Sequence, residues 1–402
     1  MSSTARKHLT DLRGATRLAI DATAGVTRLV EAMHATIARL PGTGAAEPPT
    51  RTRGITGLVY RSIHGVTRLV GGGLDKSLAA LTPLLGEAEL SPRREAVLAA
   101  ANGVLGDHLA ASANPLAIPM QFRHHGIAMT LEPAALAAAY PKAGPRLLVL
   151  LHGLCMNDLQ WRRRDHDHGA ALARDLGFTP VTLHYNSGLH IATNGQAFAR
   201  LMEQLLEAWP VALDEVVLLN HSMGGLVARS AHHYASLAGL AWPQRITRQV
   251  FLGTPHLGAP LERGGNGIDL LLGANAYTAP LARLGKIRSA GITDLRHGSL
   301  LESDWIGRDR FEHAPTHPQT VPLPESIASY AIAASTGSST EGVRARLIGD
   351  GLVPVASALG RHRNPARRLA FAPDHVWIGH GLGHFDLLDS PEVYTRLRDW
   401  LA

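Results

Sequence analysis

From residue 144 onward, short apolar runs alternate with longer segments of helical periodicity. Apolar runs of this kind are typical of strands that are buried on both faces of a sheet. Strands that alternate with helices indicate a parallel sheet joined by right-handed crossovers. The sequence therefore predicts an α/β domain over residues 141–402, with a mostly parallel central sheet and a final helix in "SPEVYTRLRDWLA". The six expected strands lie in "RLLVLLHGL", "FTPVTLHYNSG", "EVVLLNHS", "RQVFLGTPH", "SIASYAIAAS" and "RRLAFAPDHVWIG".

The first part of the chain is repetitive. "GATRLA" begins at Gly14 and "GVTRLV" at Gly25; "GITGLV" begins at Gly54 and "GVTRLV" again at Gly65. Eleven residues make about three helical turns, so equivalent positions of each pair fall on nearly the same face. Each glycine costs such a helix about 1 kcal/mol relative to alanine, which suggests that a partner packs closely against the glycine face. We expect an N-terminal helical hairpin within residues 1–90, followed by a connector with the first short strands over residues 91–140.

Charge adds a second interpretation of the hairpin. The chain has a net charge of +6, and residues 1–70 carry all of it, with ten Lys and Arg against four Asp and Glu. The hairpin either packs on the following domain or on a second copy, or it binds a membrane, lipid or polymer surface, because basic amphipathic helices can lie at anionic interfaces. Residues 1–70 contain one aromatic residue, Tyr60, and no recognised nucleic-acid motif, so nucleic acid is not an expected partner.

Composition limits the class of protein further. With 402 residues, 45% of them apolar, the chain can bury a large core. Its single cysteine, Cys155, cannot form an internal disulfide and has no partner for a thiolate metal site. No apolar leader and no run of about 20 apolar residues is apparent. We therefore expect a soluble, cytoplasmic protein, peripherally associated with a lipid surface if the second interpretation of the hairpin holds.

The stretch "VVLLNHSMGGLVAR", residues 216–229, places a lone serine between an apolar run and a run of small residues. A strand that turns sharply into a helix presents the residue at the turn above the sheet, beside the free amides of the helix N-terminus. Ser222 occupies that turn, and Gly224 supplies the small residue that the crowded turn favours. Asn220 stands where a GxSxG pattern has glycine, and asparagine tolerates unusual backbone angles and hydrogen-bonds locally. The pattern predicts Ser222 as a nucleophile.

Five segments together carry a resemblance to a known family: "LLVLLHGL", "NHSMGGLVAR", "FLGTPHLGAP", "GDGLVPVASAL" and "GHFDLL". Over roughly residues 145–402 the chain resembles the α/β-hydrolase superfamily, in its bacterial lipase and esterase branch related to PGAP1-like lipases. The resemblance implies an α/β-hydrolase fold and cleavage of carboxylic esters through an acyl-serine intermediate, with no metal or organic cofactor. The departure from the family pattern is Asn220.

A serine nucleophile needs a base and an acid that orients the base. In this fold they follow the nucleophile in the order acid, then histidine. His384 in "GHGLGHFDLL" is the expected general base, with His375 and His380 as neighbours of structural or pocket-lining role. Asp350 in "IGDGLVPV" is the expected acid, and Asp374 in "FAPDHV" is the alternative.

The tetrahedral intermediate requires two backbone donors for its oxyanion. We expect these to be the amides of Met223, directly after the serine, and of Leu154, in the loop after "LLVLLHG". Cys155 is interpreted as a small loop residue rather than a second nucleophile. "DHDH" at residues 165–168 is similar in composition to a metal cluster but lacks the ligand spacing, so it is interpreted as a solvated charge run that starts a helix.

Residues 259–325 are too long for a simple crossover and are expected to form a cap over the serine. The leading hypothesis is a lipase or esterase that acts on ester or lipid substrates. An acyltransferase with the same three residues is an alternative. A third hypothesis is a protein that binds a lipid or polymer surface through residues 1–70 and carries an inert hydrolase-like domain.

Overall fold

The computed structural model describes residues 10–22, 24, 92–259, 289–307, 318–337 and 349–402. The chain divides into two compact units. One consists of Met1–Leu90 with Leu109–Ala117, and the other of Ser91–His108 with Ile118–Ala402. Most of the hairpin expected within residues 1–90, including the repeats after the first, lies outside the described residues.

In the first unit, residues 10–22 are helical, as the first repeat predicts. Its Gly14 lies against the segment 114–116. Asn114 donates a hydrogen bond from Nδ2 to the Gly14 carbonyl at 3.0 Å, and a Cβ atom on Gly14 would lie 2.3 Å from Cγ of Leu116. Close packing against a helical glycine is therefore confirmed at this position.

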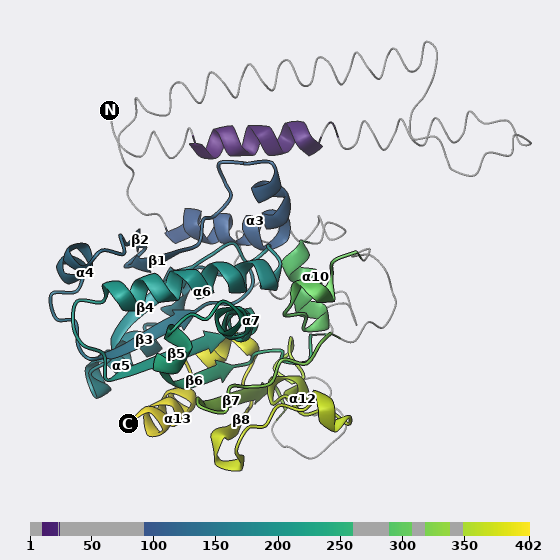
Figure 1. Ribbon diagram of the computed structural model, residues 1–402. Coiled ribbons are helices and arrows are strands. Elements are labelled where there is room, and N and C mark those ends of the chain that lie inside the picture. The colour runs from purple at the N-terminus through teal and green to yellow at the C-terminus, as the bar shows by residue number, and fades with distance from the viewer. Residues whose placement is uncertain (1–9, 23, 25–91, 260–288, 308–317, 338–348) are drawn as a thin grey trace, which may run out of the picture. The chain divides into compact units, whose positions relative to one another are not determined.

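In the second unit, the described strands form an eight-stranded sheet in the order β2-β1-β4-β3-β5-β6-β7-β8 (Figure 1). The first two strands pair antiparallel with each other, and β1 pairs antiparallel with β4. All other pairs are parallel. The mostly parallel central sheet is thus confirmed. The strands are β1 (Gln121–His124), β2 (Ile127–Ala128), β3 (Arg146–Leu151), β4 (Thr179–His184), β5 (Glu215–His221), β6 (Ile246–Leu252), β7 (Ala328–Ser335) and β8 (Val376–His380).

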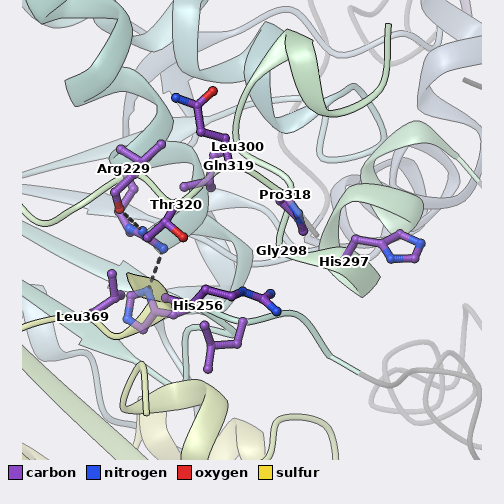
Figure 2. A pocket seen from close by; sticks show the side chains of 12 residues that line it. Arg229, His256, His297, Gly298, Leu300, Pro318, Gln319, Thr320 and Leu369 are labelled. Carbon is purple, nitrogen blue, oxygen red and sulfur yellow. Dashed lines mark hydrogen bonds between the residues drawn. The ribbon is translucent and has the colours of Figure 1, made fainter. Parts of the chain in front are cut away.

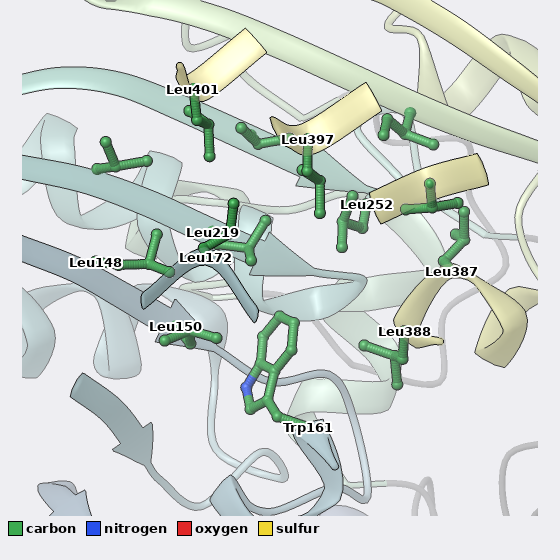
Figure 3. Packing of buried hydrophobic residues seen from close by; sticks show 14 of the residues in the cluster. Leu148, Leu150, Trp161, Leu172, Leu219, Leu252, Leu387, Leu388, Leu397 and Leu401 are labelled. Carbon is green, nitrogen blue, oxygen red and sulfur yellow. The ribbon is translucent and has the colours of Figure 1, made fainter. Parts of the chain in front are cut away.

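Helices cover both faces of this sheet (Figure 1). On one face, α6 and α7 pack together, and a Cβ on Gly225 of α7 would lie 2.7 Å from the Phe251 ring in β6. On the other face, alternate residues of β3, β5, β6 and β7 pack against α5 and α13 around Trp161 (Figure 3). The longer helices are α3 (Pro92–Ala111), α5 (His168–Leu176), α6 (Ile191–Ala208), α7 (Met223–Leu237) and α13 (Pro391–Leu401). The shorter ones are α4 (Pro133–Ala139), α10 (Ala290–His297) and α12 (Val355–Ala358).

The last strand is shorter than the sequence pattern predicts. The run "RRLAFAPDHVWIG" contributes a strand only from Val376 to His380, and the preceding residues include two 3₁₀ turns, Pro365–Arg367 and Pro373–His375. A proline at the start of each turn has no N–H to donate to a neighbouring strand, which explains why the ladder begins later.

Parallel pairing brings the carboxyl ends of the strands to one edge of the sheet. The register aligns His221 of β5 with Leu252 of β6, and Leu252 with Ile332 of β7. Loops that follow these strands therefore meet at the same edge, where open α/β sheets bind their ligands. The serine turn, the loop after β6 and the loop after β7 are brought together in this way.

The predicted cap, residues 259–325, is only partly described, since residues 260–288 and 308–317 lie outside the described set. Within it, Ser289 donates from Oγ to the Gly103 carbonyl of α3 at 2.6 Å. Oδ2 of Asp294 in α10 lies 3.0 Å from Nδ1 of His190, and His190 directly precedes α6. These contacts fasten α10 beside α3 and α6. Among the described helices, none is long and apolar enough to cross a membrane.

Candidate active site

Ser222 lies at the sharp turn between β5 and α7, as the sequence predicts. Its backbone angles are φ 53° and ψ −123°, which a residue with a side chain seldom adopts. The turn is held by the Ser222 amide, which donates to the Leu252 carbonyl at 2.8 Å. A Cβ on Gly224 would lie 2.4 Å from the Leu151 carbonyl oxygen. Only glycine at that position lets α7 begin so close to the end of β3.

Asn220 belongs to the regular part of β5, and its φ is not positive. Its buried side chain donates from Nδ2 to the Val250 carbonyl of β6 at 3.1 Å. Local hydrogen bonding by this asparagine is confirmed, whereas the unusual backbone belongs to Ser222. The departure from GxSxG therefore leaves the serine turn intact.

Asp350 and His384 are brought together at the carboxyl edge of the sheet. Nδ1 of His384 lies 2.7 Å from Oδ2 of Asp350, and both side chains are buried. The other carboxylate oxygen, Oδ1, accepts hydrogen bonds from the amides of Leu352 at 2.9 Å and Val353 at 2.7 Å. The His384 amide also donates to the Asp350 carbonyl at 3.1 Å. A carboxylate beside Nδ1 assigns the proton to that nitrogen, which leaves Nε2 as an acceptor.

The turn His384–Leu388, called the histidine turn below, contacts His221, which precedes Ser222, and lies beside Gly253 of the loop after β6. The His221 ring lies 4.8 Å from the His384 ring between centroids, and its Nε2 is 3.4 Å from the His384 carbonyl. Burial, and next the adjacent His384, hold the pKa of His221 well below its usual value, so this ring is neutral. A Cβ on Gly253 would lie 3.2 Å from Cε1 of His384. Gly253 follows Leu252, whose carbonyl accepts a hydrogen bond from the Ser222 amide. The end of β6 therefore contacts both the serine turn and the histidine turn.

The loop after β3 also lies against the serine. A Cβ on Gly153 would be 3.0 Å from Cβ of Ser222. In the part of the chain that the structure describes, the Leu154 and Met223 amides donate to no protein acceptor. These two main-chain donors are the ones that the sequence predicts for an oxyanion.

Cys155 has a left-handed backbone, with φ 60°. Its amide donates to Oγ of Ser187 at 3.0 Å, so this N–H is already used. Burial raises the pKa of the Cys155 thiol to about 12. A thiol with so high a pKa is a poor nucleophile near neutral pH, in agreement with the interpretation of Cys155 as a loop residue.

Helix α3 supports this loop, and sequence reasoning missed it. A Cβ on Gly103 would lie 2.3 Å from Sγ of Cys155, and one on Gly106 would lie 1.9 Å from Oδ1 of Asn186. Asn186 donates in return from Nδ2 to the Gly106 carbonyl at 2.9 Å. The available signal was two glycines three residues apart inside a helical segment, which lie on one face of the helix.

The "DHDH" segment starts a helix, as predicted, because the Asp167 side chain accepts the Ala170 amide at the N-terminus of α5. It is wrong, however, that the whole segment is solvated. His168 is fully buried, and its Nε2 donates to the Leu387 carbonyl at 3.0 Å, within the turn that begins at His384. Burial lowers the pKa of His168 to about 3. Among the described residues, no three His, Cys, Asp or Glu side chains gather as a metal site.

The alternative residues do not join this arrangement. The His375 ring packs against Tyr330, with centroids 4.0 Å apart. His380 is exposed at the end of β8, and Asp374 is exposed in the turn before it. The structure therefore brings Asp350, rather than Asp374, to His384.

The parallel sheet covered by helices on both faces, with a serine at the sharp turn after β5, is the architecture of an α/β-hydrolase. The described part of the second unit therefore has the fold of the α/β-hydrolases. The family model "PGAP1-like alpha/beta domain" matches residues 196–326, which span the serine turn. No curated protein matches the sequence significantly.

Several solved structures are similar to this chain at low identity. The mature lipase BlEst2 of Bacillus licheniformis is 19% identical, with 65% of this chain and 93% of the lipase covered and a TM-score of 0.39. EstA from Clostridium botulinum is 12% identical, with 64% and 87% covered and a TM-score of 0.36. A laboratory-evolved variant of a potato epoxide hydrolase is 14% identical, with 64% and 93% covered and a TM-score of 0.32. Because a shared fold does not determine a reaction, the reaction has to be argued from the site.

Proposed function

We propose that the protein is a serine hydrolase that cleaves carboxylic esters, with Ser222 as nucleophile, His384 as general base and Asp350 as the acid that orients it. The observation that carries the proposal is the 2.7 Å contact between Asp350 Oδ2 and His384 Nδ1. The histidine turn contacts His221, directly before Ser222, and lies beside Gly253 of the loop after β6. A positioned base beside a serine on a sharp turn is what activates a hydroxyl for attack.

In the proposed reaction, Ser222 Oγ attacks the ester carbonyl carbon while its proton moves to Nε2 of His384. Asp350 accepts a hydrogen bond from Nδ1–H of His384. This bond holds the ring in the productive tautomer and stabilises the imidazolium. The alcohol leaves with the proton from Nε2, and the acyl group remains on the serine. Water then attacks the acyl carbon as His384 takes its proton, and the carboxylic acid departs as Ser222 regains its hydrogen.

The negative charge that develops on the carbonyl oxygen is assigned to the Met223 and Leu154 amides. Met223 is the first residue of α7, so its N–H is one of the helix donors that have no intrahelical acceptor. Each such donor contributes about 3 kcal/mol to transition-state stabilisation in comparable sites. Neither donation requires a particular side chain, which agrees with the apolar residues at these two positions.

A panel of p-nitrophenyl esters from short to long acyl chains tests the proposal. We expect wild-type protein to release p-nitrophenol, and Ser222→Ala to lose this activity by several orders of magnitude. Ser236→Ala is the matched control, because Ser236 is an exposed serine of the same helix. Mass spectrometry of the wild type during turnover should reveal a serine-bound acyl group. Equal turnover by wild type and Ser222→Ala would contradict the role of Ser222 as nucleophile.

The same panel, with an added alcohol or thiol acceptor, separates hydrolysis from acyl transfer by its products.

The basic residues 1–70 favour delivery of the enzyme to an anionic lipid or polymer surface from a cytoplasmic location. Co-sedimentation with anionic liposomes, comparing the full chain with a version that starts at Ser91, tests this role. Equal partitioning of the two proteins would contradict it.

A further inference from the structure

A second site lies beside α7, around the buried side chains of Arg229 and His256. They line a pocket that is partly open to solvent (Figure 2). Arg229 is seven residues beyond Ser222, which is about 10 Å along the helix axis. His256 lies in the segment that follows β6. Neither residue takes part in the proposed ester hydrolysis.

Arg229 is a buried cation with no anionic partner among the described residues. Its side chain donates from Nη2 to the Val321 carbonyl, and its Nη1 lies 3.4 Å from Nδ1 of His256 (Figure 2). Its Nε, also buried, meets no acceptor. Burial lowers the pKa of Arg229 to about 10, so the guanidinium remains charged at neutral pH. A buried charge is costly unless an opposite charge or several hydrogen bonds compensate it.

His256 adds a further donor to the same place. A guanidinium can only donate, so the ring nitrogen that faces Arg229, Nδ1, must accept and carries no proton. The proton of the neutral ring is therefore on Nε2, which is buried without an acceptor. Burial, and next Arg229, hold the pKa of His256 well below its usual value, so the ring stays neutral. Two neighbouring side chains of the lining thus carry buried N–H groups that have no acceptor.

The other described residues that line the pocket also include cationic and hydrogen-bond donor groups. Among them are His297, Arg367, Gln319 and Thr320, and no Asp or Glu is among the described residues that form the lining. A pocket with cationic and N–H donor groups and no carboxylate favours a ligand that is negatively charged and rich in acceptors.

We propose that this pocket binds a small oxyanion group, phosphate or carboxylate, which the Arg229 guanidinium and Nε2–H of His256 hold at a position separate from Ser222. The site adds a ligand to the protein that ester hydrolysis does not require. Its occupation stabilises the folded chain, because an anion that binds only the folded state shifts the unfolding equilibrium in proportion to its concentration relative to Kd.

Thermal unfolding of the full chain, followed at increasing inorganic phosphate or acetate and at constant ionic strength with chloride, tests the proposal. We expect the unfolding midpoint to rise with one or both oxyanions and to saturate. The anion whose effect on the unfolding midpoint saturates at the lower concentration is the preferred ligand. The response should persist in Ser222→Ala, since the site is separate from the serine. Absence of a saturating response in both arms would overturn the proposal.

Two variants locate the binding. Arg229→Met removes the charge and should abolish the response. Because this buried substitution can prevent folding, Thr320→Glu provides a second test, since a carboxylate at the half-buried Thr320 would occupy the pocket from within. We expect Thr320→Glu to raise the midpoint without added anion and to remove the response to phosphate and acetate. Arg245→Met, at an exposed arginine of the turn before β6, should respond as the wild type does. An unchanged response in Thr320→Glu would show that the anions act elsewhere, and would overturn the assignment.

Discussion

Oδ2 of Asp350 lies 2.7 Å from Nδ1 of His384, while Oδ1 of the same carboxylate accepts two backbone amides. The carboxylate therefore has a fixed direction, set by the loop after β7 rather than by the histidine alone. A ring held by such a group keeps its Nε2 side available, because the opposite nitrogen is committed to the acid.

Replacement of Asp350 by asparagine tests this relationship. In Asp350→Asn the amide NH₂ can face Nδ1, which favours the tautomer with its proton on Nε2 and prevents that nitrogen from accepting the serine proton. We expect kcat for p-nitrophenyl esters to fall by about 10³- to 10⁴-fold, with little change in the circular dichroism spectrum. Asp374→Asn, at an exposed turn, should retain wild-type turnover. Similar activities of Asp350→Asn and Asp374→Asn would show that Asp350 does not orient His384.

Gly253 occupies the space between the serine and histidine turns, with φ 58°. A Cβ at this position would lie 2.7 Å from Leu387 and 3.2 Å from both Asp350 Oδ2 and His384 Cε1. Gly253→Ala should therefore displace the histidine turn and lower kcat/KM by at least tenfold. Gly239→Ala is matched for backbone strain, because its φ is 67° and nothing lies within 4 Å of the added Cβ. Both variants lose stability by roughly 1 kcal/mol or more from the left-handed backbone, but only Gly253→Ala should lose activity. Comparable kinetics in the two would contradict the steric explanation.

Ser187 anchors the loop that carries the proposed oxyanion donor Leu154. In Ser187→Ala the Cys155 amide loses its acceptor, so the loop relaxes and the adjacent donor is less well placed. We expect kcat to fall roughly tenfold with a smaller change in KM, since a misplaced oxyanion donor weakens mainly the transition state. Cys155→Ala keeps the main-chain donation and should stay within a few-fold of wild type. An inactive Cys155→Ala with an unaffected Ser187→Ala would reverse this interpretation.

Buried histidines predict that stability falls in acid. Burial is the main cause that lowers the pKa of His152 to about 3, of His168 to about 3 and of His232 to about 4. In the unfolded chain these rings titrate near 6.5, so below that pH the unfolded state binds more protons than the folded state. The unfolding free energy should be constant above about pH 6.5 and fall as the pH drops toward 4, by up to about 1.4 kcal/mol per pH unit for each ring.

Urea unfolding at pH 8, 6 and 5 measures this dependence. His168→Gln should reduce its steepness relative to the wild type, whatever its effect on stability at pH 8. The exposed His380 gives a matched variant, His380→Gln, that should leave the steepness unchanged. A midpoint that rises between pH 8 and pH 5 would be the opposite of the expected sign.

The sequence predicts well what depends on local pattern. The apolar runs locate the parallel strands, and the small residues after Ser222 locate the serine turn, because a strand that ends in a crowded turn requires them. Asp350 and His384 follow from the order of residues in the family that the chain resembles. Their contact, by contrast, depends on how two loops meet at the edge of the sheet.

Other parts of the structure leave no such pattern. Arg123 of β1 contacts Glu95 of α3 at 2.8 Å and Asp158 at 3.2 Å, and all three side chains are largely or wholly buried. In a sequence such residues are typical of solvent-exposed faces, because charged side chains are seldom buried without partners. Their burial depends on three separate segments that meet only in the folded protein. Gly103 is similar, since its role depends on what packs against it.

The packing of α3 against the Cys155 loop has a practical consequence. The domain that carries the proposed site begins upstream of its first strand, so a shortened protein that starts at β1 would lose the helix against which that loop rests. Substitution of Gly103 by a larger residue would push on the loop from behind, at a position that a search restricted to the sheet and its turns would pass over. Shortened or redesigned versions of the chain should therefore keep residues 92–108, because this helix supports the loop beside Ser222.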